Sequence, residues 1–300
     1  MPASPTSPPP STSASPARPV WVDGALLEAG TARVDALDHG LVVGDGVFES
    51  CGVTGGRPFA LTLHLRRLAR SAAGLGLPAP DDAQVRSAVD AVVGALGAAG
   101  ERALLRITWT AGPGPLGSAR APEGERRGTL VVAAVAQAPL APGQRAVTVP
   151  WTRNERSAVA GLKTTSYAEN VVALARARER GAGEALLANT RGEVCEGTGS
   201  NVLVAVGGEL LTPPLSSGCL AGTSRALLLH WAGEEGLPVR EATMPEEELQ
   251  RAPEVLLTSS TRDVQPLAAL DDRPLVTSEL GRAAVELFAR RRAEDDDPLL

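Results

Sequence analysis

One side chain in this sequence is chemically unlike all the others. Lys163 is the single lysine of a chain that has 29 lysines and arginines together. A guanidinium stays protonated, whereas a lysine amine can lose its proton and form a Schiff base. Lys163 is therefore a candidate for covalent catalysis. The alternative is that a coding bias towards arginine left one lysine by chance, so the residues around it must decide.

Hydroxyl groups in two segments suit the binding of an anion. Thr223 and Ser224 follow Gly222 at the predicted start of a helix, where free backbone N–H groups and the helix dipole attract negative charge. Either hydroxyl could instead serve only as a helix cap. The second segment, residues 258–261, ends a predicted strand, where hydroxyls often satisfy the backbone of a turn. Together with Lys163, these groups suit an aldehyde that bears a phosphate.

Two charged residues add to this pattern. Arg67 shares a helical face with His64 and Ser71, opposite a leucine stripe, so it either clamps a phosphate or lies on a solvated face. Glu196 lies in CEGTGSN between two predicted strands, where an apolar setting would require a cationic partner. A protonated pyridine nitrogen is such a partner.

The elements that position these residues follow from hydrophobic periodicity and turn signals. Helices are predicted over residues 61–75, 80–96 and 166–180, after Gly222, and around 280–287. Strands are predicted at 20–24, 25–30, 101–112, 128–138, 145–151, 184–190, 192–197, 200–206, 209–213 and 254–261. In the helix at 166–180, Tyr167, Val171 and Leu174 share one face. Runs of strands with interposed helices predict an α+β fold in two halves.

Composition divides the chain into five parts. Residues 1–19 are rich in Pro, Ser and Thr and are predicted to be a disordered tail. An N-terminal domain is expected at 20–137, a Gly/Pro linker at 138–144 and a C-terminal domain at 145–292. The acidic end at 293–300 is expected to be solvated.

Charge and cysteine content exclude several classes of partner. The net charge of -6 and a pI near 5.3 argue against nucleic acid and favour a small-molecule partner. Three cysteines far apart suggest a reducing compartment, and three dispersed histidines argue against a metal site. Neither a secretion signal nor an apolar run of membrane-spanning length is visible, so no membrane partner and a cytoplasmic location are expected.

Six segments, in this order, resemble one family: the fold-type IV, class IV aminotransferases, which use pyridoxal 5'-phosphate. The segments are DHGLVVGDGVFES, HLRRLARSA, GLKTTSYAEN, GEVCEGTGSNVLV, LAGTSRALLL and LLTSSTRDVQPL. The resemblance covers roughly residues 20 to 290. It implies two α/β domains of the D-amino-acid aminotransferase-like fold, with the cofactor between them, commonly in a homodimer.

The resemblance also implies roles for individual residues. Lys163 matches the Schiff-base lysine, and Glu196 matches the partner of the pyridine nitrogen. Arg67 matches a phosphate ligand. Thr223 and Ser224 match further phosphate contacts, although the family's LPGIT pattern appears here as LAGTS, a change that keeps the hydroxyl.

Two further matches concern the rest of the cofactor. Ser260 matches a contact near the phosphate or the substrate. Tyr167 resembles the tyrosine that contacts the 3-hydroxyl of the cofactor. It follows Lys163 by four residues, however, where the family often has five, so its role is open.

The reaction is less certain than the cofactor. The segment around Lys163 resembles that of 4-amino-4-deoxychorismate lyases, which release pyruvate and p-aminobenzoate. Ser50 falls where such a lyase has a hydroxyl that delivers a proton to the departing enolate. Val43 and residues 51–53 depart from the YGxxVFEGxR pattern of branched-chain enzymes, whereas Glu49 fits the transaminases better.

We therefore expect a lyase, with an aminotransferase of D-amino or branched-chain amino acids and a 2-oxo acid as the alternative. The substrate in either reaction is a small amine with a carboxylate. Arg106 and Thr261 are the candidates to contact it, although Arg106 could simply be a strand-end surface charge.

Three other classes fit less well. Residues 112–117 match GxGxxG literally, but two prolines and the absence of a following helix argue against a dinucleotide site. GTGSN lacks the GxSxG spacing of serine hydrolases. A descendant without catalytic activity would be expected to have lost Lys163 or Glu196, and both are present.

Overall fold

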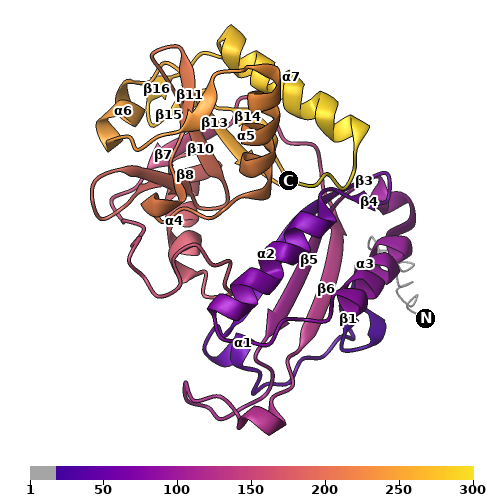
Figure 1. The fold of residues 1–300 in the computed structure, drawn as a ribbon. Helices are drawn as coiled ribbons and strands as arrows, with labels where there is room; N and C mark the ends of the chain where they lie inside the picture. The colour runs from indigo at the N-terminus through magenta and orange to yellow at the C-terminus, as the bar shows by residue number, and fades with distance from the viewer. Residues whose placement is uncertain (1–17) are drawn as a thin grey trace, which may run out of the picture.

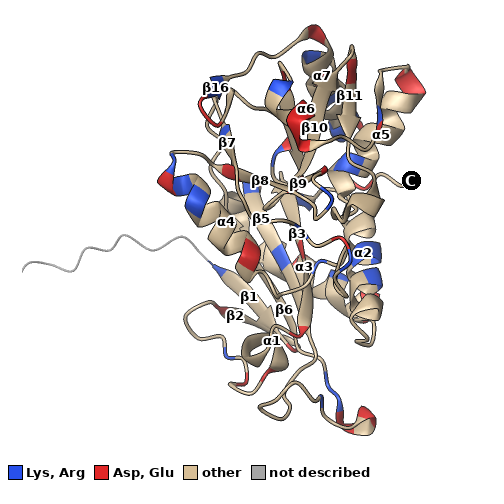
Figure 2. Cartoon of the chain, turned by 90° about the vertical axis from the view of Figure 1, so that its left-hand side faces the viewer, with Lys and Arg blue, Asp and Glu red and all other residues tan. Residues whose placement is uncertain are grey.

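The computed structural model describes residues 18–300, so nearly all of the tail predicted at 1–19 lies outside the described residues. The mixed helix and sheet content confirms the predicted α+β class, although in the second half two helices each connect a pair of parallel neighbouring strands. Basic and acidic residues are interspersed along the chain (Figure 2). Among the described residues, no helix is long and apolar enough to cross a membrane.

The first half of the chain forms one antiparallel sheet of six strands in the order β2-β1-β6-β5-β3-β4. Its strands are β1 (Pro19–Val22), β2 (Ala25–Glu28), β3 (Gly46–Thr54), β4 (Arg57–Pro58), β5 (Arg102–Thr110) and β6 (Leu130–Ala136). Helices α2 (Leu61–Gly74) and α3 (Asp82–Leu96) cover one face (Figure 1), and a short helix, α1 (His39–Val42), precedes β3. Short 3-10 helices lie at Gly97–Glu101 and Glu123–Glu125.

The register of β3 and β5 assigns side chains to the two faces of this sheet. Val47 and Cys51 in β3 join Leu105 and Ile107 in the core beneath α2 and α3. Because neighbouring residues of a strand point to opposite faces, the intervening positions face outwards. Phe48 and the facing pair of Ser50 and Arg106 are among these positions.

The second half forms two five-stranded sheets, in the orders β16-β15-β7-β8-β9 and β12-β11-β10-β13-β14. Their strands are β7 (Arg145–Thr148), β8 (Glu184–Ala188), β9 (Val194–Gly197), β10 (Asn201–Val206), β11 (Glu209–Thr212), β12 (Val239–Glu241), β13 (Val255–Ser259), β14 (Asp263–Pro266), β15 (Ala269–Leu270) and β16 (Arg273–Pro274). The helices are α4 (Ala168–Glu179), α5 (Thr223–Glu235), α6 (Glu246–Arg251) and α7 (Glu279–Glu294), with a 3-10 turn at Leu215–Ser217. Figure 1 shows α5 and α7 packed side by side.

The change of sheet between β6 and β7 occurs around residues 138–144. The domain boundaries themselves stay a prediction. The predicted helices and strands listed above are all present, with ends shifted by a few residues. Sequence patterns did not predict β3, which contains two glycines and no clear alternation.

The predicted face of α4 is wrong. Val171 is 63% exposed, and the buried residues of this helix are Asn170, Ala173 and Ala177. Small residues at this spacing let α4 approach β8 closely, so the packed face is not the face with the largest apolar side chains.

The acidic end of the chain is docked rather than solvated, which corrects a second expectation. The Asp297 carboxylate accepts hydrogen bonds from the backbone N–H and hydroxyl of Thr62, at 2.8 and 2.6 Å. Asp296 pairs with Arg57 at 2.8 Å, and its carbonyl accepts from the N–H of Ala60 at 2.6 Å. These contacts lie at the first turn of α2, whose N-cap residue Ala60 makes no side-chain capping bond of its own.

Candidate active site

Backbone contacts fix Lys163 between α2 and the start of β3. The N–H of Phe48 donates to the carbonyl of Lys163 at 2.9 Å, and the N–H of Thr165 donates to the carbonyl of Gly46 at 2.8 Å. The N–H of Lys163 donates to the hydroxyl of Ser71 at 3.2 Å. Residues 163–165, called the lysine segment below, therefore bond to β3 as a short additional strand would.

The amine of Lys163 lies against aromatic rings. Its Nζ is 4.5 Å from the centroid of Phe48 and 5.8 Å from that of Tyr167. Loss of solvent, together with the nearby charge of Arg67, lowers the pKa of Lys163 to about 8. The amine can therefore lose its proton near neutral pH, as a nucleophile requires.

Glu196 is held from two sides. Arg153 donates from Nε to Oε1 at 3.0 Å, and the N–H of Leu220 donates to Oε2 at 2.9 Å. Burial raises the pKa of Glu196 despite the opposing charge of Arg153. Arg153 is the cationic neighbour that the sequence could not identify, because 43 residues separate the pair. Its Nη2 also donates to Asn170 of α4 at 3.1 Å.

Tyr167 lies between the lysine segment and the loop after β9. Its hydroxyl donates to the carbonyl of Thr198 at 3.2 Å, and Asn170 donates to the same carbonyl. Its ring packs edge-on against Phe48, with centroids 5.2 Å apart. These contacts hold the phenol beside Lys163, although Tyr167 follows Lys163 by four residues where the family often has five.

The helical face of α2 that bears Arg67 is buried, so the solvated alternative is wrong. His64, Arg67 and Ser71 are 0%, 5% and 1% exposed. Arg67 forms two bonds with the carboxylate of Glu49, from Nε at 2.7 Å and from Nη2 at 2.6 Å. Its Nη1 donates to the carbonyl of Ala221 at 2.9 Å, just before α5.

Glu49 is a functional candidate that sequence reasoning valued only as a family marker. Burial alone would raise its pKa, but Arg67 and His64 hold the pKa of Glu49 well below its usual range. The carboxylate is therefore ionised within the core. No signal in the sequence pairs residues from β3 and α2 in this way.

The start of α5 has the properties of an anion site. Its N-cap residue Gly222 makes no side-chain capping bond, so the first N–H groups of α5 have no such partner. Thr223 and Ser224 are buried, and the Ser224 hydroxyl has no hydrogen-bond partner. A buried unpaired hydroxyl beside open N–H groups fits a phosphate group.

The hydroxyls of Ser260 and Thr261, which follow β13, have different contacts. Ser260 Oγ lies 3.0 Å from Nε2 of His64, which joins it to the face of α2 that bears Arg67. Thr261 Oγ1 lies 3.3 Å from Ser259 Oγ within its own turn. Within residues 18–300, no hydrogen bond joins Thr261 to Lys163, so its expected substrate contact stays a prediction.

Ser50 and Arg106 lie on the outward face of β3 and β5, beside the ring that Lys163 contacts. Arg106 Cζ lies 3.3 Å from the centroid of Phe48, and its Nη1 donates to Ser50 Oγ at 3.3 Å. A guanidinium and a hydroxyl thus share the side of the sheet on which Lys163 lies against Phe48.

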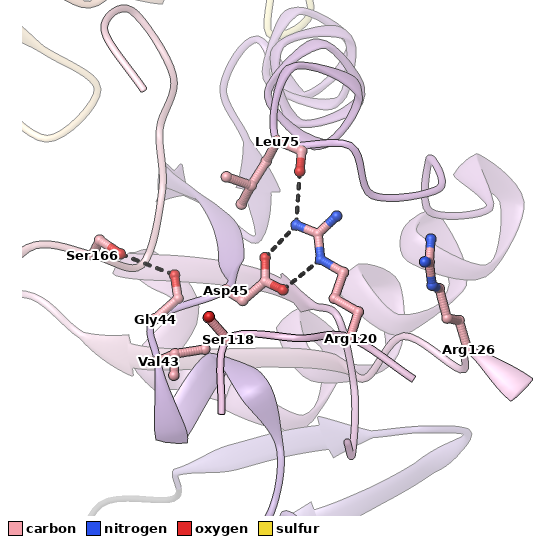
Figure 3. Close-up of a pocket in the computed structure, with 8 residues that line it drawn as sticks. All are labelled: Val43, Gly44, Asp45, Leu75, Ser118, Arg120, Arg126 and Ser166. Atoms are coloured by element: carbon pink, nitrogen blue, oxygen red, sulfur yellow. Dashed lines mark hydrogen bonds and ion pairs between the residues drawn. The ribbon is translucent and has the colours of Figure 1, made fainter. Parts of the chain in front are cut away.

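The loop at 112–128 is anchored close to the lysine segment. In Figure 3, Arg120 points at Asp45, to which its Nε and Nη2 donate at 2.6 Å each, and its Nη2 also donates to the carbonyl of Leu75. These residues border a cavity of about 470 Å³ that Ser166 and Gly44 also line. A loop rather than a helix follows the GxGxxG match at 112–117, which argues against the dinucleotide site.

Comparison with known proteins now decides the family. Residues 46–270 match the model of the amino-transferase class IV family. The chain belongs to the class IV aminotransferases. Members of this family use pyridoxal phosphate, and the residues around Lys163 and at the start of α5 fit that cofactor. The chain is therefore a pyridoxal phosphate-dependent enzyme, as predicted.

Similar class IV proteins have more than one activity. A putative branched-chain-amino-acid aminotransferase of Methanocaldococcus jannaschii is 31% identical over 89% of this chain and 93% of its own length. A bifunctional aminodeoxychorismate lyase / D-amino acid transaminase of Mycobacterium tuberculosis is 30% identical over 89% of this chain and 96% of its own. A fold IV transaminase structure from Curtobacterium pusillum has a TM-score of 0.78 at 34% identity, covering 90% of this chain and 93% of its own.

Proposed function

We propose that Lys163 attaches pyridoxal phosphate covalently and that the other residues hold the parts of the cofactor. Glu196 would partner the ring nitrogen, and Tyr167 would contact the 3-hydroxyl. Thr223 and Ser224, with the backbone N–H groups of α5, can hold the phosphate. Arg67 and Ser260 complete that end of the site. The supporting observations are the lowered pKa of Lys163 and the unpaired buried hydroxyl of Ser224.

In this arrangement each residue has a definable task. The bound cofactor supplies an electron sink for the carbanion formed at the substrate carbon. The Lys163 amine would act as the base that accepts the proton of the substrate carbon. The Arg106 guanidinium lies beside Lys163 and can hold a substrate carboxylate. The rings of Phe48 and Tyr167 exclude water from the amine.

For the reaction we propose 4-amino-4-deoxychorismate lyase activity, with release of pyruvate and p-aminobenzoate. One observation supports it most: the Ser50 hydroxyl bonds to Arg106 on the face that Phe48 and Lys163 share. From there it can deliver a proton to a departing enolate. The M. tuberculosis relative, whose name includes the lyase activity, supports the same assignment.

The second candidate is an aminotransferase of D-amino or branched-chain amino acids. The buried, ionised Glu49 favours it, because that residue fits the transaminase pattern. Relatives named as D-alanine aminotransferases, such as that of Bacillus licheniformis at 29% identity over 85% of this chain, support it too. Both activities can belong to one protein, as the bifunctional name of the M. tuberculosis relative illustrates.

One experiment separates the two reactions. The purified enzyme is incubated with aminodeoxychorismate and, separately, with D-amino or branched-chain amino acids and 2-oxoglutarate. We expect release of p-aminobenzoate and pyruvate in equal amounts. Formation of the keto acid alone would contradict the lyase assignment and support the aminotransferase.

A substitution tests the task of Ser50. Ser50→Ala should lower the lyase rate by about 10²- to 10⁴-fold, the usual contribution of a positioned proton donor. Ser50→Thr, which keeps the hydroxyl, should retain most of the rate. The absorption spectrum of bound cofactor should not change in either variant. If Ser50→Ala keeps the wild-type rate, Ser50 does not deliver the proton.

We also propose that the enzyme is a homodimer. The outer face of the six-stranded sheet, opposite α2 and α3, bears Val131, Ala133 and Val135, and Val135 is 41% exposed. These β6 positions form an apolar strip beside Arg106 of β5, and such a strip suits contact with a second copy. A cytoplasmic location stays a prediction.

A further inference from the structure

Three side chains form a hydrogen-bonded chain that crosses from one half of the molecule to the other. Glu49 Oε2 of β3 lies 2.6 Å from Nδ1 of His64 on α2, and Nε2 of His64 lies 3.0 Å from Oγ of Ser260 after β13. Glu49 and His64 are both fully buried. Such a chain has a definite arrangement of protons, because bulk water does not reach its centre.

The arrangement follows from the charge of Glu49. Its carboxylate is ionised and can only accept, so Nδ1 of His64 must donate to it. In a neutral imidazole Nε2 then has a lone pair and accepts the single proton of the Ser260 hydroxyl. In this state Ser260 offers only lone pairs to the cofactor site. It cannot also donate a hydrogen bond to a phosphate.

The charges near Ser260 and the start of α5 give a second reason to expect that phosphate binding changes the protonation of His64. The positive charge of Arg67 is offset by its two bonds to Glu49. A phosphate monoester brings a charge of about -1.5 to -2 at pH 7. His64 can supply a further positive charge on this side, because its Nε2 lies 3.0 Å from the Ser260 hydroxyl.

We propose that binding of the cofactor's phosphate group takes up a proton at His64. The proton comes from solvent and binds Nε2 of His64. That N–H then donates to Ser260 Oγ, and the hydroxyl proton of Ser260 turns to donate to a phosphate oxygen. No covalent bond between heavy atoms forms or breaks. The inference rests on the proposed function, in which the phosphate lies between α5 and Ser260.

The charged groups around His64 determine whether phosphate binding raises or lowers its pKa. Burial lowers the pKa of His64, Glu49 of β3 opposes this, and Arg67 of α2 and Lys163 of the lysine segment lower it further. Ser260 is neutral. A phosphate on the Ser260 side would add negative charge and raise the pKa. His64 is therefore neutral in the free site and protonated in the bound site, so affinity for the phosphate falls as pH rises.

Pyridoxal and pyridoxal phosphate form a matched pair of probes, because both present the same aldehyde to Lys163 and only one has the phosphate. Each is titrated calorimetrically into the full-length apoenzyme near pH 8, in two buffers of different ionisation enthalpy. We expect pyridoxal phosphate to take up about one proton more than pyridoxal. The ratio of their affinities should fall by up to about tenfold per pH unit above neutrality.

Two variants and a control test whether His64 is the group that takes up the extra proton. His64→Asn keeps a donor for Glu49 but cannot titrate, so the extra proton uptake should vanish. Ser260→Ala removes the hydroxyl that joins His64 to the phosphate and should reduce the uptake. His230→Asn changes an exposed histidine of α5 and should leave it intact.

The outcomes separate the inference from the proposed function. Equal uptake with both probes, or an excess that persists in His64→Asn, overturns the inference while leaving the cofactor site in place. If borohydride reduction traps neither aldehyde on Lys163, the proposed function fails and the inference with it. Should His64→Asn not fold, loss of the extra uptake in Ser260→Ala supports the linkage, and its persistence there contradicts it.

Discussion

At the scale of single residues, the environment of Lys163 explains why this position requires an amine. Phe48 and Tyr167 strip solvent from it, and Arg67 lies close enough to repel a second positive charge. An arginine would keep its proton in such a setting. Positive charge elsewhere in the chain is supplied by arginine, whereas the local chemistry explains why this position is a lysine.

The pKa of Lys163 leads to a prediction about pH. The neutral amine is the reactive form, so the rate of pyridoxal addition to the apoenzyme should rise about tenfold per pH unit below pH 8 and level off above it. Stopped-flow absorbance measures this rate. Pyridoxal is used so that phosphate linkage does not contribute. A midpoint near the ordinary lysine value of about 10.4 would contradict the proposed environment.

Individual residues also mark the limit of sequence reasoning. Lys163 and Glu196 stand out by residue type. In the structure the Lys163 amine lies against aromatic rings, and the buried Glu196 pairs with a cationic neighbour. Arg153 and the buried role of Glu49 did not emerge, because each acts through a partner distant in the sequence. Pairing of this kind is set by tertiary packing, which leaves no periodic or spacing signal along the chain.

At the scale of elements, α2 is the helix on which the proposed phosphate end of the site depends. It bears His64, Arg67 and Ser71, and its first turn is capped by the end of the chain. Periodicity predicted this helix because its leucines recur on one face. The cap could not be predicted, since 235 residues separate Thr62 from Asp297.

The cap leads to a prediction about stability. Asp297→Ala removes the acceptor of the Thr62 N–H and should lower the free energy of unfolding by about 1 kcal/mol. For a chain of this size the melting temperature should fall by about 2 °C. Asp90→Ala, which removes an exposed charge of α3, is the control and should change little. An equal effect in both variants would mean that Asp297 does not cap α2.

At the scale of the whole molecule, runs of strands with interposed helices predicted the α+β class, but they did not predict the strand order within each sheet. β3 escaped prediction because tertiary contacts with β5 and the lysine segment, rather than its own composition, stabilise it as a strand. β3 supplies site residues on both faces of the sheet. Glu49 points to the side of α2, and Phe48 and Ser50 point to the outer face.

The exposed apolar part of the outer face, on β6, leads to a prediction about assembly. If a second copy covers Val135, then Val135→Glu should shift the protein from dimer to monomer in sedimentation velocity, because a buried unpaired charge is unfavourable. Val171→Glu, at an exposed position of α4, offers a comparison on another surface. A wild-type monomer, or a dimer unaffected by Val135→Glu, would contradict this interface.

The central claim is that the single lysine is the point of cofactor attachment. The direct test is to incubate the protein with pyridoxal phosphate, reduce it with borohydride, digest it and locate the added mass by mass spectrometry. Lys163 and the amino terminus are the only amines available in the sequence. We predict the added group on the peptide that contains Lys163 and its loss in Lys163→Arg. Labelling confined to the amino terminus, or no labelling, would contradict the account.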